Sequence, residues 1–129
     1  MAKRVLVAED EALIAMVLAD LLEAAGHRVS VAADGEEALS AALATDAGPD
    51  VLVTDLNMPG VRGEDLIRLV RSQRPRLPVV VVTGSPPAGG VEALRRLAGG
   101  GGPLLLLHKP IDCDALLSAI DGFAEAGAA

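Results

Sequence analysis

The sequence is almost without aromatic residues: it has no Trp and no Tyr, and Phe123 is its only Phe. Modules that bind single-stranded nucleic acid stack bases on aromatic rings, so this composition argues against such a module. The charge agrees, because 11 basic and 18 acidic residues give a formal net charge of −7, which a phosphate backbone would repel. We therefore expect no nucleic-acid partner.

Cysteine and long apolar runs are scarce as well. Cys113 is the single cysteine, which excludes an internal disulfide and a zinc site built from cysteines. No uninterrupted apolar run approaches the roughly 18 residues that a membrane helix needs. Acidic residues at 9–11 interrupt the first apolar stretch too early for an export signal. These absences predict a cytoplasmic protein without a membrane partner.

The chain instead offers short aliphatic segments that alternate with longer helical ones. Its 129 residues are 51% apolar, enough for one domain with a core. The pattern predicts strands at 5–8, 29–32, 51–54, 79–82 and 104–107, and helices at 12–25, 36–44, 64–72, 91–98 and 115–126. Five such units predict a three-layer α/β/α sandwich over residues 1–129, with its core at about 3–126 and no output domain.

Three local features refine this expectation. The strands at 79–82 and 104–107 contain only Val or only Leu, which is typical of strands inside a parallel sheet. In the first helix, Ile14, Val17, Leu18 and Leu21 form the expected buried stripe, and Leu13 and Met16 leave the other side apolar too. Four consecutive glycines at 99–102 predict a flexible connection into the last strand.

Polar side chains directly follow four of the expected strands. Glu9 and Asp10 follow the first strand, Asp55 the third, Thr83 the fourth and Lys109 the fifth, after His108. The carboxyl ends of parallel strands share one edge of the sheet, where ligands bind. We therefore expect three carboxylates, a hydroxyl and an ammonium to converge there. His108 is expected to face away from this edge, and His27, in a loop, to be solvated.

The chemistry of this set can be argued from its donors. Oxygen ligands without Cys or His suit a hard cation, Mg²⁺ most plausibly. A carboxylate beside a metal, a lysine and a hydroxyl is equipped to attack phosphorus and form an aspartyl phosphate. The metal and the lysine would offset the charge of the transferring group.

Four strings of the sequence surround these polar residues: Val7-Ala8-Glu9-Asp10-Glu11, Asp55-Leu56-Asn57-Met58-Pro59-Gly60, Val82-Thr83-Gly84 and His108-Lys109-Pro110. By the order and spacing of these strings, the sequence resembles, over essentially its whole length, the receiver domains of response regulators in two-component signalling. The resemblance implies a flavodoxin-like sheet of strand order 2-1-3-4-5. It also implies a signalling phosphoacceptor rather than an enzyme, one that promotes only its own phosphorylation and dephosphorylation.

The resemblance further implies residue roles. Asp55 would accept a phosphoryl group from a phosphohistidine of a sensor histidine kinase or a histidine phosphotransfer protein. Asp10 and Asp55 would bind Mg²⁺ by their side chains, Asn57 through its backbone carbonyl and Glu9 mostly through water. Thr83 and Lys109 would contact the phosphoryl group.

Output would use the helix at 91–98, the strand at 104–107 and the helix at 115–126 to switch binding of an unknown partner. The chain would be a monomer or a weak, phosphorylation-dependent dimer. The family usually places Tyr or Phe three residues before the lysine, and here that position is Leu106. Either switching uses backbone and helix shifts without an aromatic, or coupling is weak. Pro86, Pro87 and the four glycines bracket the helix at 91–98, which we expect to be the most mobile element.

Other functions stay open. A phosphatase of the haloacid-dehalogenase type also uses an Asp nucleophile with Mg²⁺. Its nucleophile follows the first strand, however, and a second Asp stands where this chain has Asn57. A docking module that is never phosphorylated is another class, which Leu106 mildly favours. A receiver from a larger protein, such as a hybrid kinase, is an alternative within the first class. The apolar outer side of the first helix would dock a kinase's helical bundle, unless neighbouring loops cover it.

Overall fold

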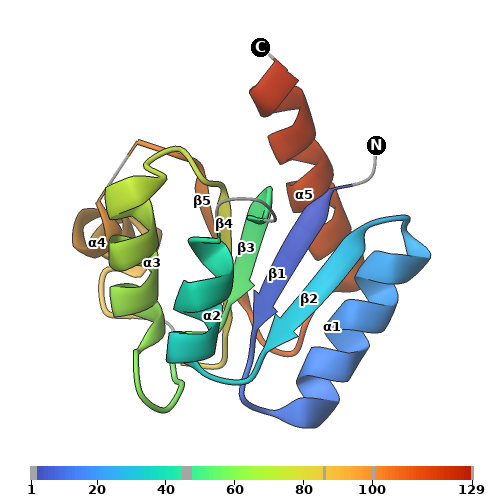
Figure 1. Ribbon diagram of the computed structural model, residues 1–129, viewed down its shortest axis with the longest axis horizontal. Coiled ribbons are helices and arrows are strands. Elements are labelled where there is room, and N and C mark those ends of the chain that lie inside the picture. The colour runs from blue at the N-terminus through green and yellow to red at the C-terminus, as the bar shows by residue number, and fades with distance from the viewer. Residues whose placement is uncertain (1–2, 45–47, 86, 100, 129) are drawn as a thin grey trace.

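The computed structural model describes residues 3–44, 48–85, 87–99 and 101–128. Five parallel strands form one sheet of order β2-β1-β3-β4-β5, and a helix follows each strand (Figure 1). The elements are β1 (Arg4–Ala8), α1 (Ala12–Ala24), β2 (Arg28–Ala32), α2 (Gly35–Ala42), β3 (Val51–Thr54), α3 (Gly63–Gln73), β4 (Val79–Thr83), α4 (Gly90–Ala98), β5 (Leu104–His108) and α5 (Cys113–Ala128). The expected α/β/α sandwich and the strand order are confirmed.

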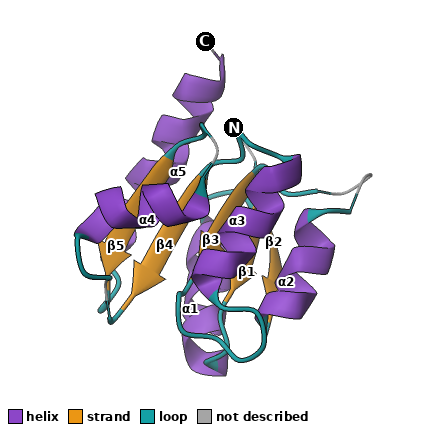
Figure 2. Cartoon of the chain, turned by 90° about the vertical axis from the view of Figure 1, so that its left-hand side faces the viewer, coloured by secondary structure: helices purple, strands orange, loops and turns teal. Residues whose placement is uncertain are grey.

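The sheet separates two apolar layers, as the alternation of side chains along each strand requires. On one face, Leu6 of β1 belongs to a buried cluster with residues of α2, α3 and α4. On the other face, Val5 and Val7 belong to a cluster with residues of α1 and α5. Figure 2 shows α2, α3 and α4 together in front of the sheet, with α1 and α5 behind it. This arrangement leaves the carboxyl ends of the strands to form the functional edge.

The two strands of uniform apolar composition differ in burial. β4 is buried along its whole length, as predicted. β5 is an edge strand: Leu105 is 38% exposed, and Leu106 and Leu107 are half-buried. Composition alone suggested an interior strand, but the expected strand order already placed β5 at the edge, and the structure confirms that order. Composition reports apolar surroundings on the two faces of a strand and not a neighbouring strand.

Two smaller expectations also need correction. Val17 is 55% exposed, and the buried stripe of α1 consists of Ala15, Leu18 and Leu22. His27 is buried rather than solvated, because its Nδ1 accepts the backbone N–H of Lys3 at 3.2 Å. Both depend on which part of the chain packs against the residue, which local periodicity does not report.

The glycine connection before β5 is hydrogen-bonded to the loop after α3 where the structure describes it. The N–H groups of Gly101 and Gly102 donate to the carbonyl of Pro75 at 3.2 and 3.0 Å. A Cβ at Gly102 would lie only 2.7 Å from the carbonyl carbon of Arg76, so this close approach requires glycine. Gly100 and Pro86 lie outside the described residues.

Candidate functional site

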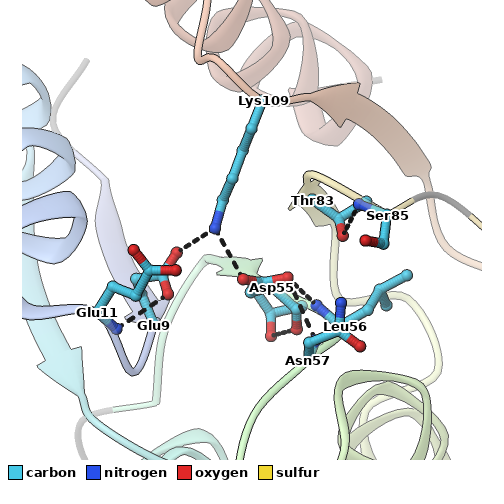
Figure 3. Close-up of polar contacts among 9 residues, drawn as sticks. Glu9, Glu11, Asp55, Leu56, Asn57, Thr83, Ser85 and Lys109 are labelled. Atoms are coloured by element: carbon cyan, nitrogen blue, oxygen red, sulfur yellow. Dashed lines mark hydrogen bonds and ion pairs between the residues drawn. The ribbon is translucent and has the colours of Figure 1, made fainter.

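The carboxyl ends of the strands bring the expected polar residues to one edge, at the lower end of the sheet in Figure 1. Glu9 follows β1, Asp55 follows β3, Thr83 ends β4 and Lys109 follows β5. Glu9, Asp55 and Thr83 are buried, with 3%, 6% and 0% of their surfaces exposed, and Asp10 is exposed. Figure 3 shows the Lys109 side chain reaching down between Glu9 and Asp55.

Lys109 joins the two buried carboxylates. Its Nζ lies 2.8 Å from Oδ2 of Asp55 and 2.9 Å from Oε1 of Glu9 (Figure 3). These pairs connect positions 54 and 100 residues apart in the chain, so only the fold brings them together. One ammonium between two carboxylates leaves a net negative charge, which favours a further cation.

The pKa values of Glu9 and Lys109 are both raised, for different reasons. Burial raises the pKa of Glu9, and the hydrogen bond from Lys109 opposes this rise. Burial alone would lower the pKa of Lys109, but its hydrogen bonds to Asp55 and Glu9 outweigh that effect, so its pKa is raised. The lysine therefore stays charged between the carboxylates.

Main-chain groups fix the orientation of the Asp55 carboxylate. Its Oδ1 accepts the N–H groups of Leu56 at 2.6 Å and of Asn57 at 3.2 Å. Oδ2 is thereby left facing Lys109. The start of α3 packs directly on this turn, because the N–H of Gly63 donates to the carbonyl of Leu56 at 3.0 Å. A Cβ at Gly63 would collide with the Asp55 carbonyl oxygen.

The acidic residues can also hold a metal ion. Glu9, Asp10 and Asp55 each offer a carboxylate oxygen, and these oxygens all lie within 4.8 Å of one another. The second oxygen of Glu9 accepts the N–H of Glu11 at 3.1 Å, which fixes the turn after β1. Asn57 is exposed in the loop that follows Asp55. An oxygen-only set of this charge fits a hard divalent cation such as Mg²⁺ and lacks the nitrogen and sulfur donors that zinc prefers.

Thr83 lies at the same edge but is not joined to the carboxylates. Within the described residues, the partner of its hydroxyl is the N–H of Ser85, which donates to Oγ1 at 3.1 Å (Figure 3). Its main-chain carbonyl accepts the N–H of Lys109 at 2.9 Å. The structure thus connects Glu9, Asp55 and Lys109 directly, and places Thr83 beside them. His108, expected to face away from this edge, is exposed.

Sequence reasoning missed two parts of the site. It did not foresee that Lys109 bridges Glu9 as well as Asp55, since nothing local links positions 9 and 109. It also missed Gly63, which allows α3 to pack on the Asp55 turn. The sequence held a weak signal for Gly63: a glycine stands just before the predicted helix at 64–72.

A hydrophobic surface lies next to the acidic edge. Leu13 and Met16 of α1 are 78% and 60% exposed, so neighbouring loops do not cover them. A shallow hollow of about 340 Å³ is lined by Leu13, Ile14, Val17, Lys109, Pro110, Ile111 and Cys113. This α1 surface adjoins Lys109 and is therefore positioned to contact whatever approaches Asp55.

Comparisons with known proteins agree on one family. The family model of the response regulator receiver domain matches residues 5–121. The response regulator protein FleR of Pseudomonas aeruginosa is 36% identical over 121 residues, covering 93% of this chain and 24% of FleR. The transcriptional regulatory protein PdtaR of Mycobacterium tuberculosis is 38% identical over 120 residues, covering 92% of this chain and 55% of PdtaR. The chain therefore spans only part of these relatives.

Solved structures show the same likeness. A response regulator receiver domain protein from Clostridium thermocellum superposes with a TM-score of 0.84 at 27% identity, covering 96% of this chain and 95% of that one. The chemotaxis protein CheY4 of Vibrio cholerae superposes with a TM-score of 0.80 at 28% identity, covering 95% and 99%. In the described part of the chain, no helix is long and apolar enough to cross a bilayer.

Proposed function

Because the chain belongs to the family of response regulator receiver domains, which are signalling phosphoacceptors, we propose that Asp55 accepts a phosphoryl group from a phosphohistidine. The observation that carries this proposal is the position of Lys109, 2.8 Å from Oδ2 of Asp55 at an acidic edge that fits Mg²⁺. Receiver domains interact with histidine kinases or histidine phosphotransfer proteins, and such a protein would be the donor.

The proposed step is a displacement at phosphorus. Oδ2 of Asp55 attacks the phosphoryl group, the new O–P bond forms, the N–P bond to the donor's histidine breaks, and the imidazole leaves with the electron pair. Oδ1 stays bonded to two backbone N–H groups, which holds the carboxylate in line. Lys109 moves with the developing charge from the carboxylate to the phosphoryl oxygens.

The metal site would support this step. Asp10 and Asp55 would bind Mg²⁺ directly, Asn57 through its carbonyl and Glu9 through water. Bound there, Mg²⁺ would supply positive charge to the phosphoryl oxygens. Water would later hydrolyse the aspartyl phosphate and release phosphate, so the chain turns over only its own modification.

The same proposal assigns a switch and an output face. Thr83 would donate its hydroxyl hydrogen to a phosphoryl oxygen on Asp55. Leu106 packs against the core beneath α2, α3 and α4 and carries no hydroxyl, so switching would use shifts of the backbone and of α4. Leu97 and Leu105 are 57% and 38% exposed on the α4-β5-α5 face, where the unknown output partner would bind.

The α1 surface would dock the helical bundle that carries the donor histidine. It is apolar and borders Lys109, so a helix bound there would face Asp55. We propose that this receiver is cytoplasmic and is a monomer or a weak phosphorylation-dependent dimer. The relatives are longer than the part that this chain matches, so a receiver module of a larger regulator is an alternative to a stand-alone receiver. The absence of a nucleic-acid partner stays an expectation from charge and composition.

The test is the intact mass after incubation with Mg²⁺ and acetyl phosphate, beside an Asp55→Asn control. We expect a labile phosphoryl adduct on the wild type alone. No adduct, with Mg²⁺ binding measured separately, would favour a docking module or strict dependence on a kinase. Release of phosphate from many small phosphoesters would favour a phosphatase instead.

A further inference from the structure

Arg71 of α3 is a buried charge that the phosphoryl chemistry does not use. Only 4% of its surface is exposed. Its Nη2 donates to the carbonyls of Pro103 at 2.6 Å and Leu77 at 3.2 Å, and its Nη1 donates to the carbonyl of Gly99 at 3.2 Å. Within the described residues its hydrogen-bond partners are all main-chain carbonyls, so its contacts position backbone rather than neutralise an acid.

Those carbonyls belong to three different segments. Leu77 precedes β4, Gly99 is the C-cap of α4, and Pro103 precedes β5. A second arginine strengthens the connection, since Nη2 of Arg95 in α4 donates to the carbonyl of Leu104 at 3.3 Å. Together with the bonds from the glycine N–H groups to Pro75, these contacts hold the end of α4 and the start of β5 to α3.

The opposite end of α4 is built differently. Its N-cap, Gly89, has φ of 88° and no side-chain hydrogen bond, and Gly90 follows with φ of 64°. The C-cap, Gly99, is left-handed too, with φ of 69°, but its carbonyl accepts a hydrogen bond from Arg71. No such side-chain bond is found at Gly89 or Gly90 within the described residues, and glycine adopts left-handed backbone without steric cost, so this end can change conformation more readily. It follows the loop that leaves β4 after Thr83, which is the side from which a phosphoryl signal would arrive.

We propose that Arg71 anchors the C-terminal end of α4, so that phosphorylation moves only the N-terminal half of the helix, which pivots about this anchor. The inference rests on the proposed phosphorylation of Asp55 and deepens its regulation. Leu97 and Leu105 belong to the anchored end, and they form a constant part of the output face. The residues around Gly89 and Gly90 form its switched part.

Hydrogen–deuterium exchange of the full chain, with and without Mg²⁺ and acetyl phosphate, tests the pivot. In the phosphorylated wild type we expect exchange to change in peptides covering 84–92 and to stay the same in peptides covering 96–104. Equal changes in both regions would overturn the proposal. Intact mass of each sample shows whether the adduct formed, so a failure of phosphorylation is recognised separately.

The anchor itself is tested without phosphorylation. Arg71→Met removes the guanidinium and keeps an apolar chain of similar length, and we expect exchange over 97–104 to quicken by about tenfold or more. Arg68→Met is the matched control on the same helix, because that arginine is exposed and its partner within the described residues is Asp65, at 3.4 Å. Equal exchange in both variants would overturn the anchor. If Arg71→Met does not fold, Arg71→Lys, which keeps the charge but loses the fork of donors, takes its place.

Discussion

At the scale of single residues, the centre of the molecule is a lysine between two buried carboxylates. The sequence predicted that Glu9, Asp55 and Lys109 share one edge, because parallel strands align their carboxyl ends. It could not predict which oxygen faces the ammonium or that Glu9 shares it, because side-chain rotamers and two main-chain N–H donors decide this. The general position of the site was therefore predictable, and its internal pairing was not.

Removal of this lysine should cost stability at neutral pH. Lys109→Met leaves Glu9 and Asp55 buried without their cation, and we expect the free energy of unfolding to fall by about 2 kcal/mol. This loss is smaller than the loss expected for a fully buried ion pair, because the lysine is partly exposed. Saturating Mg²⁺ should restore part of this loss. Urea unfolding measures both effects, and Lys3→Met controls for one lost positive charge. Equal stability of the two variants would contradict the account.

Gly63 offers a second residue-scale prediction. A Cβ there would meet the Asp55 carbonyl oxygen and Leu56 Cα, so Gly63→Ala should destabilise the chain by about 1–3 kcal/mol and slow its phosphorylation. Gly122→Ala in α5 is the control, since a Cβ at Gly122 meets nothing within 4 Å. That control should gain about 0.5–1 kcal/mol from helix propensity. Thermal unfolding and intact mass after acetyl phosphate measure the two effects.

At the scale of elements, periodicity identified every strand and helix and misjudged several surfaces. The uniform leucines of β5 suggested an interior strand, yet only the strand order places β5 at the edge, and this order came from the family resemblance. The stripe of α1 was shifted by part of a turn, so Val17 faces outward. Periodicity reports that a face is apolar, while burial depends on which elements lie opposite it.

The exposed apolar sides of α1 and α4 should have separable roles. Leu13→Glu with Met16→Glu should reduce phosphotransfer from the cognate kinase and leave phosphorylation by acetyl phosphate unchanged, because only the kinase would use the α1 surface. Leu97→Glu on α4 serves as the matched control and should leave both reactions unchanged. Phosphotransfer is followed by the rate of adduct formation. Unchanged transfer in the α1 variant would show that the kinase docks elsewhere.

At the scale of the whole molecule, the chain carries a formal net charge of −7, and three of its carboxylates meet where a cation would bind. Mg²⁺ at 100 times its dissociation constant should stabilise the fold by about 2.7 kcal/mol through mass action. Asp10→Asn removes one like charge beside two buried carboxylates. It should therefore raise the melting temperature without metal and lose most of the shift that Mg²⁺ produces. Calorimetry with and without Mg²⁺ measures these melting temperatures. If Mg²⁺ raises the melting temperature of the variant as much as that of the wild type, Asp10 is not a ligand of the metal.

The most direct measurement locates the phosphoryl group on the chain. Borohydride reduces an aspartyl phosphate to homoserine, which marks the modified position permanently for peptide sequencing by mass spectrometry. After incubation with Mg²⁺ and acetyl phosphate, homoserine should stand at position 55 in the wild type and nowhere in the Asp55→Asn variant. Homoserine at position 10, or an adduct that survives at another residue in the variant, would contradict the assignment of Asp55 as the phosphoacceptor.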